Sequence, residues 1–318
     1  MNRYRLRANY KIQNIESRRE NGTVVVDVPM LSAGELNYGL NHVKEKLYKE
    51  NVYPTEIGFD IMSLATMVYL ADTRIERVVH GQDSWSREIE LEIPVSNVEL
   101  WETQIYTVER MLKFLTGDIW KITLLSRMWQ FSKPDEIGEK SNKYDEVSLF
   151  SGGMDSLIST INSMEDKKNI LLISHAGEGL TKNAQKNIVD KFELLYPDVL
   201  HTWLDLWMVF PNNYIPEGGN DNNTRSRSFL FIGYAIFAMS GMDNISELLV
   251  PENGLIALNV PLDETRVGSF STRTTHPFYL FLWNELLQGL GLDMSVKNPY
   301  WNKTKGEMAE EVYYRHIQ

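Results

Sequence analysis

Continuous apolar runs recur through the second half of the chain and alternate with stretches of helical periodicity. The apolar runs predict five strands, at residues 147–150, 169–175, 199–209, 248–250 and 295–298. The intervening stretches predict helices at 181–195, 226–239, 276–290 and 303–314. The run at 169–175 is continuous rather than alternating, as in a parallel sheet buried on both faces. Strands separated by helical lengths predict βαβ units and an α/β fold with a doubly wound parallel sheet.

The first half of the chain mixes patterns. Strands are expected at 23–28, 87–93 and 119–125, and helices at 37–48 and 101–115. Residues 57–71 are apolar and fit either one helix or a strand followed by a helix. Together these patterns predict an α+β domain over residues 1–131. Its role is either to dock a substrate or partner or to cap the fold.

A polar stretch with Pro and Gly, residues 132–146, has the composition of a linker. It divides the chain into the N-terminal domain and a second domain over residues 147–318. The chain has 318 residues, of which 43% are hydrophobic, enough for two domains with cores.

Composition excludes several classes of protein. The absence of cysteine excludes disulfides, a Cys-ligated zinc and a thiol nucleophile in the sequence given. A net charge of −11 argues against broad nucleic-acid binding. No apolar run approaches the ~20 residues of a membrane helix, and the basic N-terminus leads into no apolar segment of a secretory signal. A cytoplasmic protein is therefore expected.

The most informative motif is Ser151-Gly152-Gly153-Met154-Asp155-Ser156, which lies between a predicted strand and a helical stretch. Glycines allow a tight turn, and the N–H groups at a helix start favour an anion. Ser151 and Ser156 add hydroxyl donors. A carboxylate at Asp155 repels phosphate unless a cation lies between them, so Mg²⁺ held jointly by Asp155 and a nucleotide is expected. The alternative is a plain strand-to-helix turn.

This pattern, SGGxDS, resembles the PP-loop of the ATP pyrophosphatases. Those enzymes cleave ATP between the α and β phosphates. They usually adenylate a carbonyl or carboxyl oxygen and let a nucleophile displace AMP. The Walker spacing GxxxxGK[ST] is absent here.

Two further groups of residues follow in the chain. Arg225 and Arg227 precede a helix, where the dipole disfavours cations, so phosphate or substrate recognition is predicted, with a solvated surface as the alternative. Glu252 and Asn253 follow the fourth strand, where a carboxylate and an amide could bind the edge of a purine-like base. An ordinary turn is the alternative there.

Three more side chains complete the predicted site. Arg273 lies in the hydroxyl-rich segment 269–277 and could bind substrate or pyrophosphate, or the segment could serve only as a helix cap. Lys305 opens the last helix and could reach the β or γ phosphate, or lie on a solvated face. His175 ends the second strand, where an adenine edge could rest, or it could be a core histidine.

In this order the motifs resemble the 7-cyano-7-deazaguanine synthases over about residues 147–314. They resemble most the longer relatives, found in bacterial anti-phage defence operons, that carry an extra N-terminal domain. The resemblance implies that ATP and Mg²⁺ bind Ser151, Gly152, Gly153, Asp155 and Ser156. It also implies that 7-carboxy-7-deazaguanine is adenylated, converted by ammonia to an amide and dehydrated to a nitrile. Glu252 and Asn253 would face the base, and Lys305 would neutralise phosphate.

The chain departs from that family in one respect. The housekeeping enzymes carry a C-terminal Cys cluster for a structural zinc, which cannot form here, so zinc is not expected and the nitrile step is open. The defence-associated relatives imply instead that a deazaguanine is joined through an amide to a partner protein from the same operon. Two alternatives remain: a non-catalytic nucleotide-sensing subunit of a defence complex, and another PP-loop enzyme that forms amides or modifies tRNA.

The N-terminal domain carries no evident catalytic cluster but several aromatic residues, among them Trp85, Trp101, Trp120 and Trp129. Trp is a residue type that anchors interfaces, although most here are expected in a core. The domain is therefore predicted to position a partner polypeptide rather than to complete the ATP site.

Overall fold

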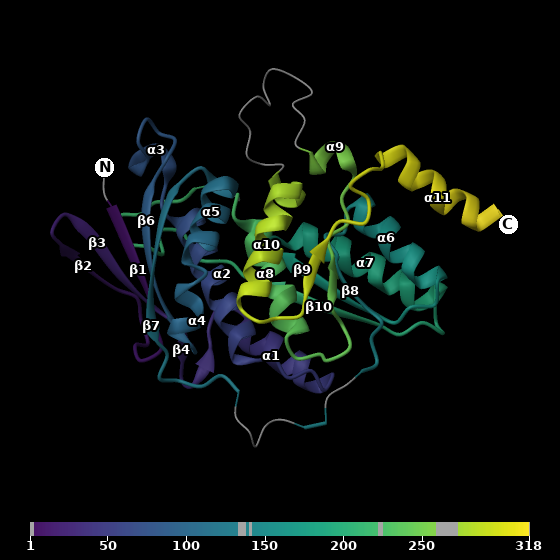
Figure 1. Cartoon of the computed structure of the whole chain (residues 1–318), viewed down its shortest axis with the longest axis horizontal. Coiled ribbons are helices and arrows are strands. Elements are labelled where there is room, and N and C mark those ends of the chain that lie inside the picture. Colours follow the sequence, from purple (N-terminus) through teal and green to yellow (C-terminus); the bar gives the residue numbers. More distant parts are fainter. Residues whose placement is uncertain (1–2, 133–137, 140–141, 222–224, 259–272, 318) are drawn as a thin grey trace.

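The computed structural model of the chain describes residues 3–132, 138–139, 142–221, 225–258 and 273–317. Its elements form two five-stranded sheets and a small ribbon of β4 (Leu31–Ser32) and β5 (Glu35–Leu36). Figure 1 shows the two sheets apart from each other with a layer of helices between them. No helix of the described part of the chain is both long and apolar enough to cross a membrane.

The second sheet is built by the C-terminal region. Its strands are parallel, in the order β10-β9-β8-β11-β12. Their bounds are β8 (Glu146–Leu149), β9 (Ile170–Ala176), β10 (His201–Trp207), β11 (Glu247–Leu249) and β12 (Ser295–Lys297). The predicted parallel α/β sheet is confirmed, and the strand order reverses between β8 and β11, where sheets of this kind bind ligands.

Helices cover both faces of this sheet, as the continuous apolar pattern of β9 requires. Leu171 and Ile173 belong to the main core, whereas Ile170 and Leu172 belong to a second core on the opposite face. The helices are α6 (Met154–Glu165), α7 (Gly179–Leu195), α8 (Arg227–Met239), α9 (Gly254–Ala257), α10 (Pro277–Gly289) and α11 (Lys305–Ile317), with a 3-10 turn η3 (Arg273–Thr275). Because alternate side chains of a strand point to opposite faces, both faces of β9 are apolar.

The first sheet is built by the N-terminal region, in the order β2-β3-β1-β6-β7. Its strands are β1 (Arg3–Asn9), β2 (Glu16–Glu20), β3 (Thr23–Pro29), β6 (Glu88–Val95) and β7 (Ile119–Ser126). Strands β1, β3, β6 and β7 run parallel to one another, and β2, which links β1 to β3, is antiparallel to β3. Helices connect β3 to β6 and β6 to β7. The predicted α+β class for this region is therefore wrong, because its helices are crossover connections of a parallel sheet.

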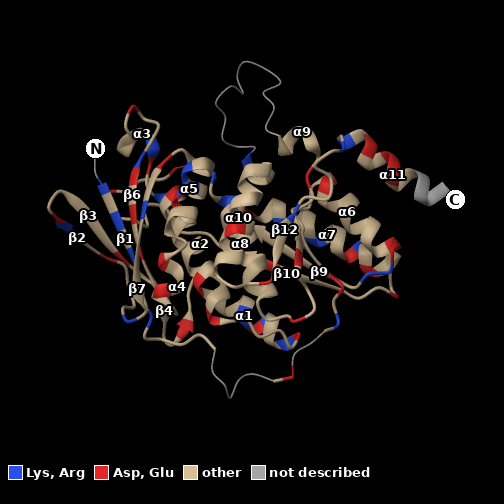
Figure 2. Cartoon of the chain, viewed as in Figure 1, with Lys and Arg blue, Asp and Glu red and all other residues tan. Residues whose placement is uncertain are grey.

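One face of the first sheet is open and carries a ladder of opposite charges. The arginines of β1 alternate with the glutamates of β6 (Figure 2), and Arg3 pairs with Glu88 while Arg5 pairs with Glu90. The buried side chains of both strands lie between these charges. This period-two pattern explains how a parallel sheet keeps one solvated face.

The N-terminal helices are α1 (Leu40–Lys49), α2 (Glu56–Arg74), α3 (Arg77–His80), α4 (Val98–Glu102) and α5 (Ile105–Thr116). Residues 57–71 thus form a single helix. The helix predicted at 101–115 is two helices, because the chain leaves helical hydrogen bonding between α4 and α5. Thr55 caps α2 by accepting from the Gly58 N–H at 3.1 Å.

The two regions share one hydrophobic core. Helix α2 packs along α8, and α5 packs against α10. At the α2–α8 contact a Cβ on Gly233 would lie 2.9 Å from the Cβ of Ala65, so only glycine allows this approach. The expected linker at 132–146 separates the two sheets in sequence, yet the main core runs across both of them.

Candidate functional site

The loop between β8 and α6 exposes the N-terminus of α6 at the carboxyl edge of the second sheet. Gly152 has a φ of 81°, the left-handed region, and a Cβ there would lie 3.0 Å from Gln185 Cγ. Gly153 is the N-cap of α6, and no side chain caps this end. The first N–H groups of α6 and the helix dipole together suit an anion.

Hydroxyl groups and one amide hold this loop in place. Ser151 Oγ accepts from the Gly153 N–H at 3.2 Å and lies 3.2 Å from Ser156 Oγ, which donates to the Gly153 carbonyl at 3.0 Å. Gln185 Nε2 donates to the Ser151 carbonyl at 3.1 Å and to the His175 carbonyl at 3.4 Å. Gln185 therefore joins the loop to the end of β9, a role that no sequence pattern indicated.

Asp155 lies in the first turn of α6 and is buried. Its Oδ2 accepts from the Asn253 backbone N–H at 3.0 Å and from Asn253 Nδ2 at 2.7 Å. Among the described residues its Oδ1 has no hydrogen-bond partner, and it faces Lys305 Nζ at 3.3 Å. Within that part of the chain, this oxygen of Asp155 is thus paired only with the ammonium group of Lys305.

Lys305 is the first residue of α11 and is half-exposed. Thr304 and Glu307 form a reciprocal cap around it: Glu307 Oε2 accepts from the Thr304 N–H at 2.7 Å, and Thr304 Oγ1 accepts from the Glu307 N–H at 3.3 Å. This capping box fixes the start of α11 and so the direction of Lys305. The structure places Lys305 beside Asp155, and its predicted contact with a phosphate stays a prediction.

Asn253 lies behind Asp155 and lines neither of the two cavities described below. Its Nδ2 binds Asp155, and its Oδ1 accepts from the Ile256 N–H at 3.4 Å as the cap of α9. Both ends of the amide are in use. The side chain therefore orients Asp155, a role that the sequence prediction did not assign to it.

Glu252 does line a cavity. Its Oε2 accepts from Thr274 Oγ1 at 3.0 Å and from Thr275 Oγ1. Burial raises the pKa of Glu252, and Asp155 adds to the rise, whereas hydrogen bonds from the two threonines and the charge of Lys305 act against it. These threonines belong to the predicted hydroxyl-rich segment, of which residues 269–272 lie outside the described part of the chain.

Arg227 opens α8 and donates through Nη2 to the His175 carbonyl at 3.3 Å. The Ser226 N–H before it donates to Asp72 Oδ2 at 2.8 Å, so α2 of the N-terminal region fixes the start of α8. Arg227 borders both cavities described below. The prediction that Arg227 belongs to the site is consistent with this position.

Arg225 and Arg273 do not lie in the site. Arg225 donates to the Thr116 carbonyl at 2.6 Å and lies over the ring of Trp85, and Arg273 donates to the Phe114 carbonyl at 2.6 Å. Both therefore bind the C-terminal end of α5, where carbonyls lack helical partners and the dipole favours cations. Their predicted substrate contacts are replaced by contacts that join the two halves of the chain.

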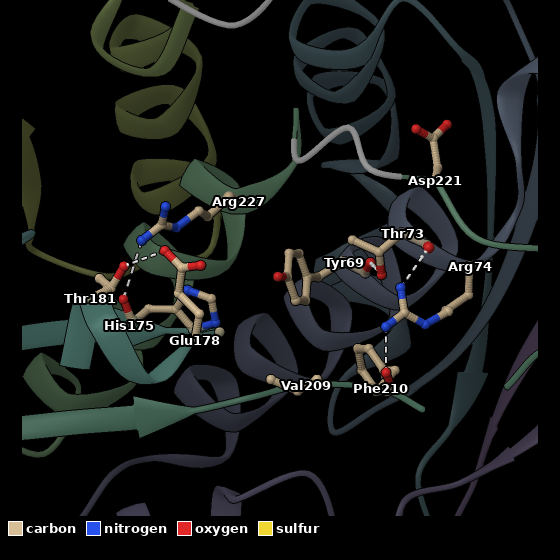
Figure 3. Close-up of a pocket in the computed structure, with 11 residues that line it drawn as sticks. Tyr69, Thr73, Arg74, His175, Glu178, Thr181, Val209, Phe210, Asp221 and Arg227 are labelled. Atoms are coloured by element: carbon tan, nitrogen blue, oxygen red, sulfur yellow. Dashed lines mark hydrogen bonds between the residues drawn. The ribbon is translucent and has the colours of Figure 1, made fainter. Parts of the chain in front are cut away.

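The first cavity lies between α2 and the ends of β9 and β10 (Figure 3) and has a volume of about 430 Å³. Tyr69, Thr73 and Arg74 of α2 form one wall. His175, Gly177, Glu178, Thr181 and Arg227 form the wall on the side of the second sheet, and Val209, Phe210 and Asp221 complete the lining. The N-terminal region thus contributes α2 to the wall of this cavity. That the region positions a partner polypeptide rather than completes the ATP site stays a prediction.

The second cavity, of about 310 Å³, adjoins the glycine loop itself. Its apolar lining is Leu149, Phe231, Ile232, Val250 and Pro251. Its polar lining is Ser151, Ser156, Arg227, Ser228, Glu252, Thr274 and Thr275. The two cavities therefore flank Arg227 on either side, and only the second reaches the loop.

His175 ends β9 and is only 1% exposed. Neither ring nitrogen makes a hydrogen bond of ordinary geometry with any residue that the structure describes, and the Tyr69 ring meets it edge-on with centroids 5.5 Å apart. Burial lowers the pKa of His175 to about 4, with Arg227 adding to the drop and the Met208 backbone opposing it. The imidazole is therefore neutral near pH 7.

This shift predicts a pH dependence of stability. Below its ordinary pKa of 6.5 the unfolded chain binds a proton at His175 that the fold, with a pKa of about 4, excludes. The free energy of unfolding is therefore unaffected by His175 above pH 6.5 and falls as pH drops from 6.5 toward 4. The loss is about 2 kcal/mol at pH 5. Urea unfolding gives the free energy of unfolding at pH 7.5 and at pH 5. The difference between these two values should be smaller in His175→Gln than in the wild type by that amount. The exposed-residue control His42→Gln should behave as the wild type does.

No family model and no curated protein matches this chain. A crystal structure of a ketoreductase domain from the bacillaene assembly line aligns with 91% of this chain and 76% of that one, at 9% identity and a TM-score of 0.25. A likeness at that score carries no argument about fold or function. The interpretation of the site therefore rests on its own geometry.

Proposed function

We propose that this chain is an ATP-dependent, AMP-forming ligase of the PP-loop type that adenylates a carboxylate. The observation that supports this most is Asp155, a buried carboxylate with one oxygen free of hydrogen bonds, in the first turn of an uncapped helix N-terminus. A carboxylate in that position serves an anion only if a cation accompanies it. The reversal of strand order beside this loop supports the same assignment.

The residues present fit Mg²⁺ held together with phosphate. The described residues hold no cluster of three or more His, Cys, Asp or Glu side chains that could bind a metal alone, so phosphate oxygens would complete its coordination. Asp155 Oδ1 would be the protein ligand, oriented by Asn253. Bound there, Mg²⁺ supplies positive charge against the phosphates.

Lys305 and Arg227 would act on the phosphates from two sides. Lys305 faces Asp155 across the mouth of the loop, as suits the β and γ phosphates that leave as pyrophosphate. Arg227 stands between the cavities, as suits the α phosphate to which the carboxylate oxygen bonds. Fixed cations that stabilise charge developing on phosphate oxygens are a strong source of rate enhancement.

We further propose the second cavity as the acceptor site, with 7-carboxy-7-deazaguanine as the acid that the sequence resemblance implies. Glu252 supports this choice, because a guanine-like edge offers neighbouring N–H donors and a carboxylate accepts several. The acid's oxygen would bond to the α phosphorus as the bond to the β phosphate breaks. An amine would then attack the acyl carbon and AMP would leave, giving an amide, with a partner protein as the proposed source of the amine.

The test incubates the full chain with ATP, Mg²⁺, 7-carboxy-7-deazaguanine and ammonium as the amine, and measures AMP and pyrophosphate by mass spectrometry. We expect both products in equal amounts, and only with the acid present. AMP formed with another carboxylate but not with this one would support a different PP-loop ligase. ATP binding without AMP from any acid, with or without an added amine, would support a nucleotide sensor and contradict the proposal.

A further inference from the structure

Helix α2, which belongs to the N-terminal region, forms a wall of the first cavity at the end of β9. A Cβ built on Gly177 would lie 4.0 Å from the Tyr69 hydroxyl and 4.0 Å from Val209 Cγ2. The Tyr69 hydroxyl and β9 therefore approach each other closely across the cavity, and Figure 3 shows Tyr69 between Arg227 and Arg74. Any ligand in this cavity would contact both halves of the chain.

His175 indicates that the cavity takes a ligand with hydrogen-bonding groups. Its ring is buried and lines the cavity, and within the described part of the chain neither nitrogen has a hydrogen bond of ordinary geometry. Buried polar groups in proteins are nearly always paired. A neutral imidazole offers one donor and one acceptor, which suits the edge of a heterocyclic base.

The charges around the cavity suit an anionic group attached to that base. Neither Arg74 nor Arg227 forms an ion pair with a carboxylate of the described residues. Arg74 instead donates to the carbonyls of Thr73 at 2.7 Å and Pro211 at 2.8 Å. Of the two acids in the lining, Glu178 accepts from Thr181 at 2.8 Å and Asp221 accepts from the Arg77 N–H at 3.1 Å.

We infer that α2 completes a nucleoside pocket: the adenosine end of ATP occupies the first cavity, with Tyr69 and Thr73 as residues that determine its affinity. This inference rests on the proposed function, since it assigns the phosphates to the glycine loop. Arg227, shared by both cavities, stands where adenosine would join its phosphates. A volume of about 430 Å³ accommodates a nucleoside, as ligand pockets of this size commonly do.

The chain offers a matched pair of threonines for the test. Thr73 Oγ1 donates to the Tyr69 carbonyl and Thr66 Oγ1 to the Met62 carbonyl, each at 2.8 Å one helical turn back. Both side chains are buried in α2, but only Thr73 lines the cavity. Thr73→Val and Thr66→Val therefore remove equivalent hydrogen bonds from the helix, but only Thr73→Val changes a side chain that could contact the ligand.

The experiment measures binding of ATP and of pyrophosphate to the full chain by calorimetry, with Mg²⁺ present. Tyr69→Leu should weaken ATP binding about tenfold or more, because aromatic contact with a base is lost, and should leave pyrophosphate binding unchanged. Thr73→Val should weaken ATP binding several-fold, and Thr66→Val should not. Thermal melts identify any variant that fails to fold. If Tyr69→Leu does not fold, the comparison of Thr73→Val with Thr66→Val tests the nucleoside pocket.

The outcomes separate this inference from the proposed function. A wild-type chain that binds neither ATP nor pyrophosphate overturns both. If Tyr69→Leu and Thr73→Val bind ATP as tightly as the wild type does, the nucleoside pocket is overturned, while the assignment of phosphates to the glycine loop stands. Equal weakening of ATP and pyrophosphate by Tyr69→Leu also contradicts the inference, because the effect would then lie at the phosphates.

Discussion

Asp155→Asn should lower pyrophosphate release from ATP by about a hundredfold or more while the protein stays folded. The substitution keeps the shape of the side chain and leaves an oxygen to accept from Asn253. It removes the charge that faces Lys305 and that would bind the cation. The measurement is the rate of pyrophosphate release at saturating ATP and acceptor acid, beside a thermal melt.

The matched control is Asp166→Asn at the other end of the same helix, where Asp166 is the exposed C-cap of α6. An aspartate there lies at the negative end of the dipole, so its loss should not lower activity. Lys305→Met should have the same kind of effect as Asp155→Asn: the rate of the chemical step should fall more than the affinity for ATP. An Asp155→Asn protein that releases pyrophosphate at the wild-type rate would remove this carboxylate from the mechanism.

The glycine loop could be predicted from sequence because its determinants are local. Gly152, Gly153 and Asp155 lie within one turn between a strand and a helix, and the structure places them there. Asn253 and Arg225 show the limit of that approach. Each has the chemistry to bind a ligand, but a distant partner, Asp155 or the Thr116 carbonyl, takes up its hydrogen bonds.

The structure of the N-terminal region was harder to predict from sequence, for two different reasons. Strand β1 does carry a signal, since arginines alternate with Tyr4, Leu6 and Ala8 over residues 3–8, and this alternation was missed. Helix α2 carries none, because nearly all its residues are buried and no polar stripe marks the face that lines the cavity. The wall formed by Tyr69, Thr73 and Arg74 could only emerge from tertiary packing.

The tryptophans of the N-terminal region differ in their exposure. Trp101 and Trp120 are buried in the core, as most were expected to be, while Trp85 is exposed and lies under Arg225. Partner docking by this region stays a prediction. Removing residues 1–131 would expose the face of α8 that packs on α2, so point substitutions test that prediction better than deletion.

The second large effect is expected in stability, at a buried network of charges within the N-terminal region. Arg87 Nη2 donates to Asp72 Oδ1 at 2.6 Å and to Asp118 Oδ2 at 2.7 Å, and all three side chains are essentially buried. Arg77 also binds Asp118. Burial alone would lower the pKa of Arg87, but Asp72 and Asp118 hold it above its ordinary value.

Arg87→Met should lower the free energy of unfolding by about 3–5 kcal/mol, because it leaves two buried carboxylates to share Arg77. The control Arg3→Met removes an arginine from the exposed pair with Glu88 and should cost about 1 kcal/mol or less. Urea unfolding of the three proteins at pH 7 gives the comparison. Because Asp72 also accepts from the Ser226 N–H, Arg87→Met should weaken ATP binding through Arg227 as well. Equal stability losses in the two variants would mean that the buried network contributes no more to the stability of the fold than an exposed ion pair does.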